Sequence, residues 1–592
     1  MKLLRLKITD PAGFRSLPCG FEHHFRSEWS LQDELAKPEG FAPFVCAGPN
    51  GSGKSNLLEA LAAIFFQLEV LRVRRSFLPE VLQSAEMDFS PVAFELEYLI
   101  RVPPEYVRPD GPVWAKVGVW KNSGESVRFQ WENQSDFDTD AYEVFKGGHA
   151  DILLPQYVLG YSSGENEILS LPFFKLRFVQ FDEYWNALTG QLSYPGHPET
   201  RLAYLDNGFS QAILLCNLLF QDDATLQPFR EDVGIEALQE FRIIIKRSIE
   251  VSADVAEGFM AGDYVEKGYV QDDYAVSNPA LRKDSESGRY TVNLMQLLEA
   301  SPNSAKNFDP LVTRLKRCAT LSYVDDAADT LILDFWVNEE TKKAFRANFE
   351  DAPLMLFQAF QVLLTLNLYS VSDALKTDLY RSTSHYASET VPTLASDQRV
   401  MRFKFVRFSK QGVAQPMMLK ELSDGEHQLL HSLGLCLLFR NTNSLFLLDE
   451  PETHFNPDWR SNFITRLRQC FSGTDDTHEM LVTTHAPFLI SDSKKEKVLV
   501  FKKDRDSGKV SISNPDFKTL GASINRITMS EIFDKRETIG GRAQEILETF
   551  RSRFERGEDK NQLLAEIDDQ LGDSVEKVLL MKTILDSPEG RS

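Results

Sequence analysis

The chain has 592 residues, of which 42% are hydrophobic and 26% are charged, a composition typical of a folded globular protein with several domains. Its formal net charge of −22 argues against a protein that grips nucleic acid over its whole surface, although a local basic patch is compatible with it. The six cysteines form no CxxC pair and no apolar run is long enough to span a bilayer. We therefore expect reduced thiols, no zinc site, no membrane anchor and a cytoplasmic location.

The first recognisable motif is a glycine-rich turn between a strand and a helix. Residues 1–8 alternate like an opening strand, residues 41–47 form a second, apolar strand, and residues 56–68 are amphipathic. Between them lies Gly48-Pro49-Asn50-Gly51-Ser52-Gly53-Lys54-Ser55. Strand, glycine-rich turn and helix stand in the order that a phosphate-binding loop requires.

The chemistry of this loop follows from its residue types. The glycines let backbone N–H groups turn inward around a phosphate, and the helix N-terminus adds positive potential. We expect Lys54 to reach the β- and γ-phosphates of ATP and the Ser55 hydroxyl to bind Mg²⁺. The predicted nucleotide-binding residues of this segment are Gly48, Asn50, Gly51, Ser52, Gly53, Lys54, Ser55 and Asn56.

Three alternating segments follow, at 91–101, 113–120 and 126–131, and predict a small antiparallel sheet appended to the first lobe. Gln156 lies just beyond them. It is a candidate for a glutamine that senses water or metal near the γ-phosphate, while a solvated loop glutamine is the simpler alternative.

Residues 185–399 contain no nucleotide motif, no internal repeat and no sustained heptads. We predict a mostly helical insertion. The helices are expected at residues 202–220, 235–249, 292–300, 311–318 and 353–369.

Polar motifs return in the second half. After a predicted strand at 402–408, Ser423, Gly425 and Glu426 precede an apolar helix at 429–439. The apolar run 446–448 then reads as a strand buried on both faces, and it ends in Asp449-Glu450. A further buried strand, 480–484, ends at His485, and 498–502 predicts one strand more.

These side chains suit one reaction. Asp449 would complete magnesium coordination, Glu450 would orient or deprotonate the attacking water, and His485 would hydrogen-bond the γ-phosphate. Each motif has an ordinary alternative when taken alone. Asp449-Glu450 could be a solvated turn at a strand end, His485 a core histidine, and Ser423 a helix N-cap.

In their order, these motifs resemble the signature, Walker B and switch-histidine motifs of ABC-type ATPases. The resemblance covers both lobes of an ATPase head, roughly residues 1–180 and 400–515. It implies that Ser423, Gly425 and Glu426 bind the γ-phosphate held by an opposite subunit, so that two chains close head-to-head on two ATP molecules. Asn456 and Pro457 resemble the D-loop that crosses between subunits. Arg15 resembles an arginine near the nucleotide in RecF- and SMC-like heads, with a surface arginine as the alternative.

The compact insertion distinguishes the chain from transporter heads and from SMC proteins with their long coiled coils. It is similar to OLD-type and PtuA-like ATPases of bacterial anti-phage systems, and residues 483–489 resemble their switch region. OLD-type proteins carry a nuclease domain after the head, for which the segment after Leu520 is too short. Asp568 and Asp569 read as a solvated helix face, and His427 with His431 lack a third ligand for a metal.

We therefore expect no nuclease site in this chain. The resemblance to PtuA implies a separate HNH-type nuclease subunit and, in retron systems, a reverse transcriptase with its multicopy RNA–DNA hybrid. The expected fold is α/β: a two-lobed ABC-type head with a mixed sheet, a large insertion and a helical C-terminal tail. The expected domains are 1–184, 185–399, 400–520 and a charged tail at 521–592 that could dock a partner. The alternative function is a DNA-repair or chromosome-maintenance ATPase of RecF or SMC type acting directly on DNA.

Overall fold

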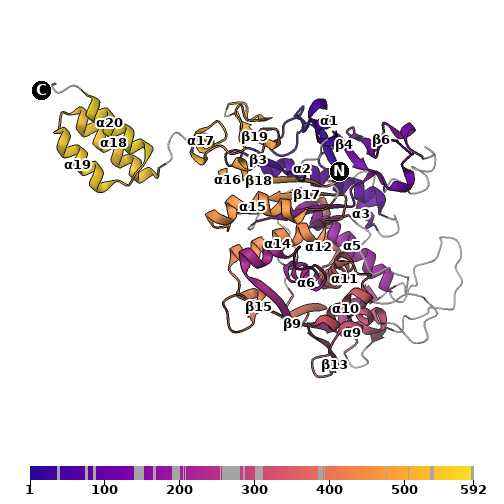
Figure 1. Ribbon diagram of the computed structural model, residues 1–592. Coiled ribbons are helices and arrows are strands. Elements are labelled where there is room, and N and C mark those ends of the chain that lie inside the picture. The colour runs from indigo at the N-terminus through magenta and orange to yellow at the C-terminus, as the bar shows by residue number, and fades with distance from the viewer. Residues whose placement is uncertain are drawn as a thin grey trace.

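The fold is seen in a computed structural model of the chain (Figure 1). It describes residues 1–36, 40–73, 78–83, 89–138, 152–163, 169–189, 201–204, 206, 208–253, 255–256, 280–283, 287–299, 311–383, 391, 394–474, 477–504, 506–533 and 539–587.

A seven-stranded mixed sheet organises the head. Its order is β20-β19-β3-β18-β17-β7-β8, and only the edge pair β19–β20 is antiparallel. The strands are β3 (Phe44–Ala47), β7 (Tyr157–Ser162), β8 (Leu202–Tyr204), β17 (Ser444–Asp449), β18 (Glu479–Thr484), β19 (Val498–Lys503) and β20 (Val510–Ser513). The α/β class and the mixed sheet are therefore confirmed.

The apolar runs of the central strands have a direct explanation. Successive residues of β17 alternate between two hydrophobic cores, with Phe446 and Leu448 in one and Leu445 and Leu447 in the other. Helix α2 (Lys54–Arg72) supplies the core on one face. Helices α14 (Asp424–Leu438) and α15 (Pro457–Cys470) supply the other. Because helices cover both faces, β17 has no solvent side and every one of its residues is buried.

The predicted antiparallel sheet is present and larger than expected. Its order is β2-β1-β4-β5-β6, and its inner face joins the core of α2. The strands are β1 (Lys2–Ile8), β2 (Glu22–His24), β4 (Phe94–Arg101), β5 (Trp114–Lys121) and β6 (Arg128–Trp131); helices α1 (Glu28–Ala36) and α3 (Glu80–Gln83) flank them.

The inserted segment contributes a second five-stranded sheet as well as helices. The order β13-β14-β9-β15-β16 joins it to the strand that leads into the second lobe, and β10-β12-β11 form a separate small sheet. The strands are β9 (Ile235–Lys246), β10 (Ser248–Val251), β11 (Leu281–Lys283), β12 (Tyr290–Asn293), β13 (Leu321–Asp325), β14 (Thr330–Trp336), β15 (Met401–Lys410) and β16 (Met417–Met418). The helices are α5 (Leu171–Thr189), α6 (Ser210–Phe220), α8 (Leu294–Leu298), α9 (Leu311–Cys318), α10 (Glu339–Asn348), α11 (Pro353–Thr365) and α12 (Asp373–Arg381).

The helix predicted at 235–249 is wrong, since this stretch holds strands β9 and β10. Ile235, Leu238, Phe241 and Ile245 fit helical spacing, but Phe241, Ile243 and Ile245 also alternate with period two and are buried on one face. The run of β-branched isoleucines favours the strand. Pairing with β14 and β15 on its two sides then makes β9 the centre of the sheet.

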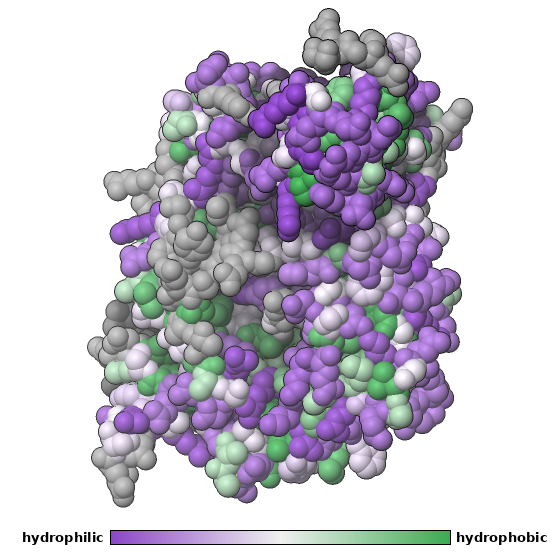
Figure 2. All heavy atoms as spheres, turned by 90° about the vertical axis from the view of Figure 1, so that its left-hand side faces the viewer, coloured by the Kyte–Doolittle hydropathy of each residue, from purple (hydrophilic) through white to green (hydrophobic). Residues whose placement is uncertain are grey.

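The C-terminal tail folds into three helices, α18 (Gly541–Glu555), α19 (Lys560–Gln570) and α20 (Val575–Asp586). Residues 571–574 separate α19 from α20. The three helices share a core of their own, built on Phe550, Leu563, Ile567 and Ile584. In Figure 1 this bundle stands apart from the head, beyond α16 (Pro487–Ser491) and α17 (Ile524–Met529). On the face that Figure 2 shows, hydrophilic residues dominate and hydrophobic ones are scattered.

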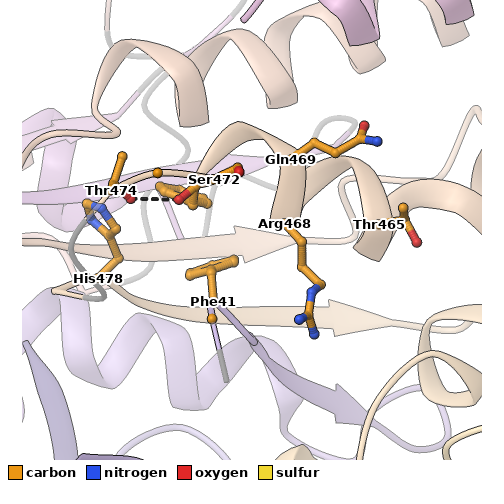
Figure 3. A pocket seen from close by; sticks show the side chains of 10 residues that line it. Phe41, Thr465, Arg468, Gln469, Ser472, Thr474 and His478 are labelled. Atoms are coloured by element: carbon orange, nitrogen blue, oxygen red, sulfur yellow. Dashed lines mark hydrogen bonds between the residues drawn. The ribbon is translucent and has the colours of Figure 1, made fainter. Parts of the chain in front are cut away.

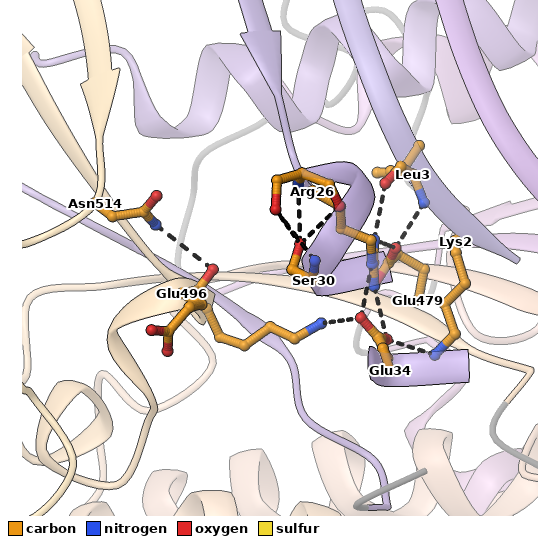
Figure 4. A network of polar contacts seen from close by, with 10 residues as sticks. Lys2, Leu3, Arg26, Ser30, Glu34, Glu479, Glu496 and Asn514 are labelled. Atoms are coloured by element: carbon orange, nitrogen blue, oxygen red, sulfur yellow. Dashed lines mark hydrogen bonds and ion pairs between the residues drawn. The ribbon is translucent and has the colours of Figure 1, made fainter. Parts of the chain in front are cut away.

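A buried ion cluster fastens the N-terminal segment to the sheet (Figure 4). Arg26 and Glu479 each expose 2% of their side chains and bond at 2.6 Å; Arg26 also bonds Glu34 on α1 at 2.8 Å. Lys2 and Lys497 approach Glu34 at 3.0 and 3.2 Å. The cluster joins β1, α1 and the start of β18, so these chain-distant segments form one structural unit.

Among the residues that the structure describes, no single helix combines the length and apolar character needed to cross a membrane. Glu339–Asn348 and Pro353–Ser370 meet these criteria only when joined, and they meet at a 77° bend.

Candidate nucleotide site

The glycine-rich loop runs from the end of β3 into α2, as predicted. Gly48 has φ 149° and Gly53 has φ 100°. A Cβ on Gly48 would lie 2.5 Å from the carbonyl oxygen of Phe501, and one on Gly53 would lie 2.7 Å from Ser16 Oγ. Both positions therefore need glycine for the backbone angle and for the close approach of a neighbour.

Lys54 lies folded over this loop. Its Nζ donates to the carbonyls of Gly48 at 3.0 Å and Pro49 at 3.1 Å, and stands 3.1 Å from His485 Nε2. Burial lowers the pKa of Lys54, against the opposing effect of the Glu450 and Asp449 carboxylates. The hydroxyl of Ser52 is buried and has no hydrogen-bond partner among the described residues. The loop thus holds a cation and a polar atom that suit a phosphate group.

Asp449 ends β17 beneath the loop, and its side chain is joined to two other segments. Ser55 Oγ donates to Asp449 Oδ1 at 2.8 Å, and Thr483 Oγ1 donates to the same oxygen at 2.6 Å. Burial raises the pKa of Asp449, and these two hydrogen bonds oppose the rise. Mg²⁺ takes few protein ligands where phosphates fill other coordination positions. The hydroxyl of Ser55 and the carboxylate of Asp449, in contact beside the phosphate loop, fit that role.

Glu450 takes a backbone conformation that non-glycine residues rarely adopt, with φ 50°. Thr483 Oγ1 accepts its N–H at 3.0 Å, and the Thr453 hydroxyl donates to its carbonyl at 2.9 Å. The turn aims the carboxylate at His485, whose Nε2 lies 3.0 Å from Glu450 Oε1. The hydrogen bond from His485 lowers the pKa of Glu450 despite partial burial, so the carboxylate is ionised at neutral pH.

Asn56 and Arg15 lie on the helix side of the loop. Asn56 Oδ1 accepts from Ser16 Oγ at 2.6 Å. Arg15 binds the buried carboxylate of Glu59 at 2.8 Å and the carbonyl of Thr383. Burial raises the pKa of Glu59, and Arg15 opposes that rise. Arg15 is thus partnered with α2, and its assignment to the nucleotide stays a prediction.

The structure corrects the assignment of Gln156 as a magnesium ligand. Its Oε1 accepts the N–H of Asn443 at 2.7 Å, beside the first residue of β17. Ser162, at the other end of β7, is the residue opposite Asp449. At about 3.3 Å per residue, Asn443 and Asp449 are about 20 Å apart along the strand. Gln156 therefore lies at the wrong edge of the sheet.

The signature residues form the N-terminus of α14. Ser423 caps the helix, its N–H donating to Glu426 Oε2 at 2.8 Å and its hydroxyl accepting the N–H of Glu426 at 3.4 Å. Burial by itself would raise the pKa of Glu426, but hydrogen bonds with Lys410 and Ser423 outweigh that effect and lower the pKa. A Cβ on Gly425 would lie 2.7 Å from the carbonyl oxygen of His454. Ser423 and Asp424 are exposed, so this helix end is open to a partner.

Two residues of the site escaped the sequence analysis. Thr483 joins Asp449 to the turn at Glu450. Gln428, on the signature helix, bonds two segments beside that turn, at Ser163 and at His454. Gln428 Nε2 donates to Ser163 Oγ at 2.7 Å, and its Oε1 accepts the N–H of His454 at 2.8 Å. The signal for Thr483 was its place near the end of a buried strand, two residues before His485; Gln428 offered no signal beyond its position in the helix.

Other polar features belong elsewhere. His431 Nδ1 lies 2.8 Å from Ser210 Oγ, a packing contact between α14 and α6, and no group of three metal-ligating side chains occurs among the described residues. A cavity of about 450 Å³ is lined by residues that include Phe41, Arg468, Phe471 and His478; Figure 3 shows several of its lining side chains. Phe41 precedes β3 and His478 precedes β18, so the cavity lies at the amino edge of the sheet, away from the phosphate loop.

Residues 282–491 match the family described as "AAA domain, putative AbiEii toxin, Type IV TA system". The matched residues contain the signature helix, Asp449, Glu450 and His485, and lie after the phosphate loop in the chain. A solved structure described as the SmcHead bound to the C-winged helix domain of ScpA is similar at 11% identity over 87% of this chain and 98% of that chain, with a TM-score of 0.30.

Proposed function

We propose that the protein binds ATP with Mg²⁺ and hydrolyses it. The observation that carries the proposal is the convergence of three distant segments on one edge of the sheet. Ser55 donates to Asp449 there, and His485 Nε2 lies 3.1 Å from Lys54 Nζ and 3.0 Å from Glu450 Oε1. Lys54 supplies a cation that attracts the phosphates, and Ser55 with Asp449 supplies two metal ligands. Glu450 supplies a base, and His485 supplies a hydrogen-bond donor to the phosphate.

The contacts at His485 explain why a bound phosphate would be favourable. Its Nε2 lies near both Glu450 Oε1 and Lys54 Nζ, yet one ring nitrogen cannot donate to the carboxylate and accept from the ammonium at once. A phosphate oxygen would accept from Lys54 and His485 together. Glu450 would then be released from His485 and could accept a proton from water. Mg²⁺, held by Ser55 and Asp449, would neutralise charge on the phosphates.

We further propose a head-to-head dimer in which each signature helix completes the site of the other chain. Exposed Ser423 and the first backbone N–H groups of α14 form a donor set for an anion, which the helix dipole favours. Two sites related by a twofold axis would close together. Asn456, the N-cap of α15, stands in the adjoining turn and would cross to the partner.

The biological role we propose is control of a separate HNH-type nuclease in anti-phage defence, with a reverse transcriptase and its RNA–DNA hybrid in a retron setting. It rests on the resemblance to PtuA-like ATPases and is supported by the match to the AbiEii-type family. Affinity purification of the chain from its native host tests it. Recovery of an HNH protein supports the role. Salt-dependent binding of DNA by the isolated chain, with no nuclease recovered, favours the RecF or SMC type instead.

The ATPase itself is tested with Glu450→Gln. This change keeps size and polarity and removes the base, so turnover should fall about 10²- to 10⁴-fold while ATP still binds. Turnover equal to wild type would show that Glu450 is not the base.

A further inference from the structure

Glu452 is a buried carboxyl that the proposed reaction leaves without a role. It lies in the turn between β17 and α15 and is 3% exposed. One carboxyl oxygen, Oε1, accepts a hydrogen bond from Thr484 Oγ1. The other, Oε2, is buried without a hydrogen-bond partner among the described residues. A carboxyl with so few partners is costly to bury, which indicates that its position has a use.

Thr484 is the residue through which Glu452 acts. Its hydroxyl donates to Glu452 and accepts the N–H of Ala486 at 2.8 Å. Residues 484 and 486 flank His485, so one hydroxyl closes the backbone turn around the histidine. Thr484 is fully buried, so bulk water does not reach its hydroxyl.

The imidazole depends on this turn for its placement. His485 Nε2 lies 3.0 Å from Glu450 Oε1 and 3.1 Å from Lys54 Nζ, while the side chain is 36% exposed. Because part of the ring faces solvent, packing does not hold it on that side. A shift of its backbone would carry it away from both partners, and displacements of about 1 Å in a catalytic group can reduce rates about a hundredfold.

We propose that Glu452 is a positioning residue for His485, acting through the hydroxyl of Thr484. The same turn also contacts the signature helix, because the N–H of His454 donates to Gln428 Oε1 at 2.8 Å. The turn that holds Glu452 is therefore linked both to the segment of the histidine and to the helix that we assign to the other subunit's nucleotide. This inference rests on the proposed ATPase function.

The test is the steady-state hydrolysis of ATP by the full-length chain. Thr484→Val keeps the shape and removes the hydroxyl, and it should lower kcat about tenfold to a hundredfold with little change in KM. Thr484→Ser should restore most of the rate. Glu452→Gln keeps an acceptor for Thr484 and should be milder than Glu452→Ala. Thr442→Val, which removes another buried hydroxyl at the opposite edge of the sheet, should leave kcat unchanged.

Double variants separate positioning from a general loss of structure. If Thr484 acts through His485, adding Thr484→Val to His485→Ala should not lower kcat further. Multiplicative losses, or a Thr484→Val variant as fast as wild type, would overturn the inference. A His485→Ala variant as active as wild type would instead overturn the assignment of His485 in the proposed function.

Discussion

Ser55 donates a hydrogen bond to Asp449 at 2.8 Å across 394 positions of the chain. Ser55 lies at the start of α2, after the loop that follows β3, and Asp449 ends β17; β3 and β17 are not neighbours, because β18 lies between them. Thr483, at the end of that intervening strand, bonds the same carboxylate oxygen. The pair that we assign to Mg²⁺ is thus preset by three adjacent strand ends, which is where open α/β sheets place their ligands.

Lys54→Ala should abolish ATP binding. The ammonium is the one cation that the structure places over the phosphate loop among the described residues, and it already bonds two loop carbonyls. Its loss removes the strongest attraction for the β- and γ-phosphates. Isothermal titration with ATP checks the prediction, with Lys404→Ala, an exposed lysine on the insertion sheet, as the control. Unchanged affinity in Lys54→Ala would contradict the phosphate-loop assignment.

Thr483→Val should weaken the binding of magnesium and raise the Mg²⁺ concentration that half-saturates turnover. Valine keeps the shape of threonine but cannot donate to Asp449 or accept the N–H of Glu450. Loss of such a supporting hydrogen bond commonly costs about 10- to 100-fold in metal affinity or activity. Titration of turnover against Mg²⁺ measures the shift in the half-saturating concentration. The expectation fails if this concentration matches that of the wild type.

Ser423→Arg should leave ATP binding by single chains intact and prevent dimer-coupled hydrolysis. The arginine would place a bulky side chain where we propose that a partner's phosphate docks. Loss of the helix cap alone costs about 1 kcal/mol, and Ser372→Arg at the N-cap of α12 controls for that effect. Light scattering with ATP and the Glu450→Gln background reports the dimer. A fully active Ser423→Arg variant would refute the shared site.

The sequence predicted which segments form the buried strands and the phosphate loop, because both have local signatures. It did not predict the contacts between them. Gln156 matched a role by its place in the chain, but only the register of β7 against β17 shows that it lies at the far edge of the sheet. The left-handed backbone of Glu450 is likewise set by Thr453 and Thr483, since no residue preference favours it. The prediction for residues 235–246 was wrong because their apolar spacing fits both the helical period and the strand period of two. Pairing with the neighbouring strands selects the strand.

The ion cluster around Arg26 should make the free energy of unfolding depend on pH in the acid range. Burial opposes ionisation of Glu34 and Glu479, but Arg26 and the nearby lysines outweigh it and lower the pKa of both carboxyls. Carboxyls with a lowered folded pKa stabilise the protein above their unfolded value of about 4.3, and this contribution is lost as pH falls through the folded pKa.

Urea unfolding between pH 7 and pH 3 measures this contribution. The free energy of unfolding should decline below about pH 4.3, and less steeply in Glu479→Gln, which lacks one of the titrating carboxyls. Arg26→Met should destabilise the protein by about 3–5 kcal/mol at pH 7, because it leaves Glu479 charged and without its main partner. Glu548→Gln, at an exposed pair in the C-terminal bundle, should behave like the wild type. An equally steep decline in Glu479→Gln would show that other carboxyls govern acid unfolding.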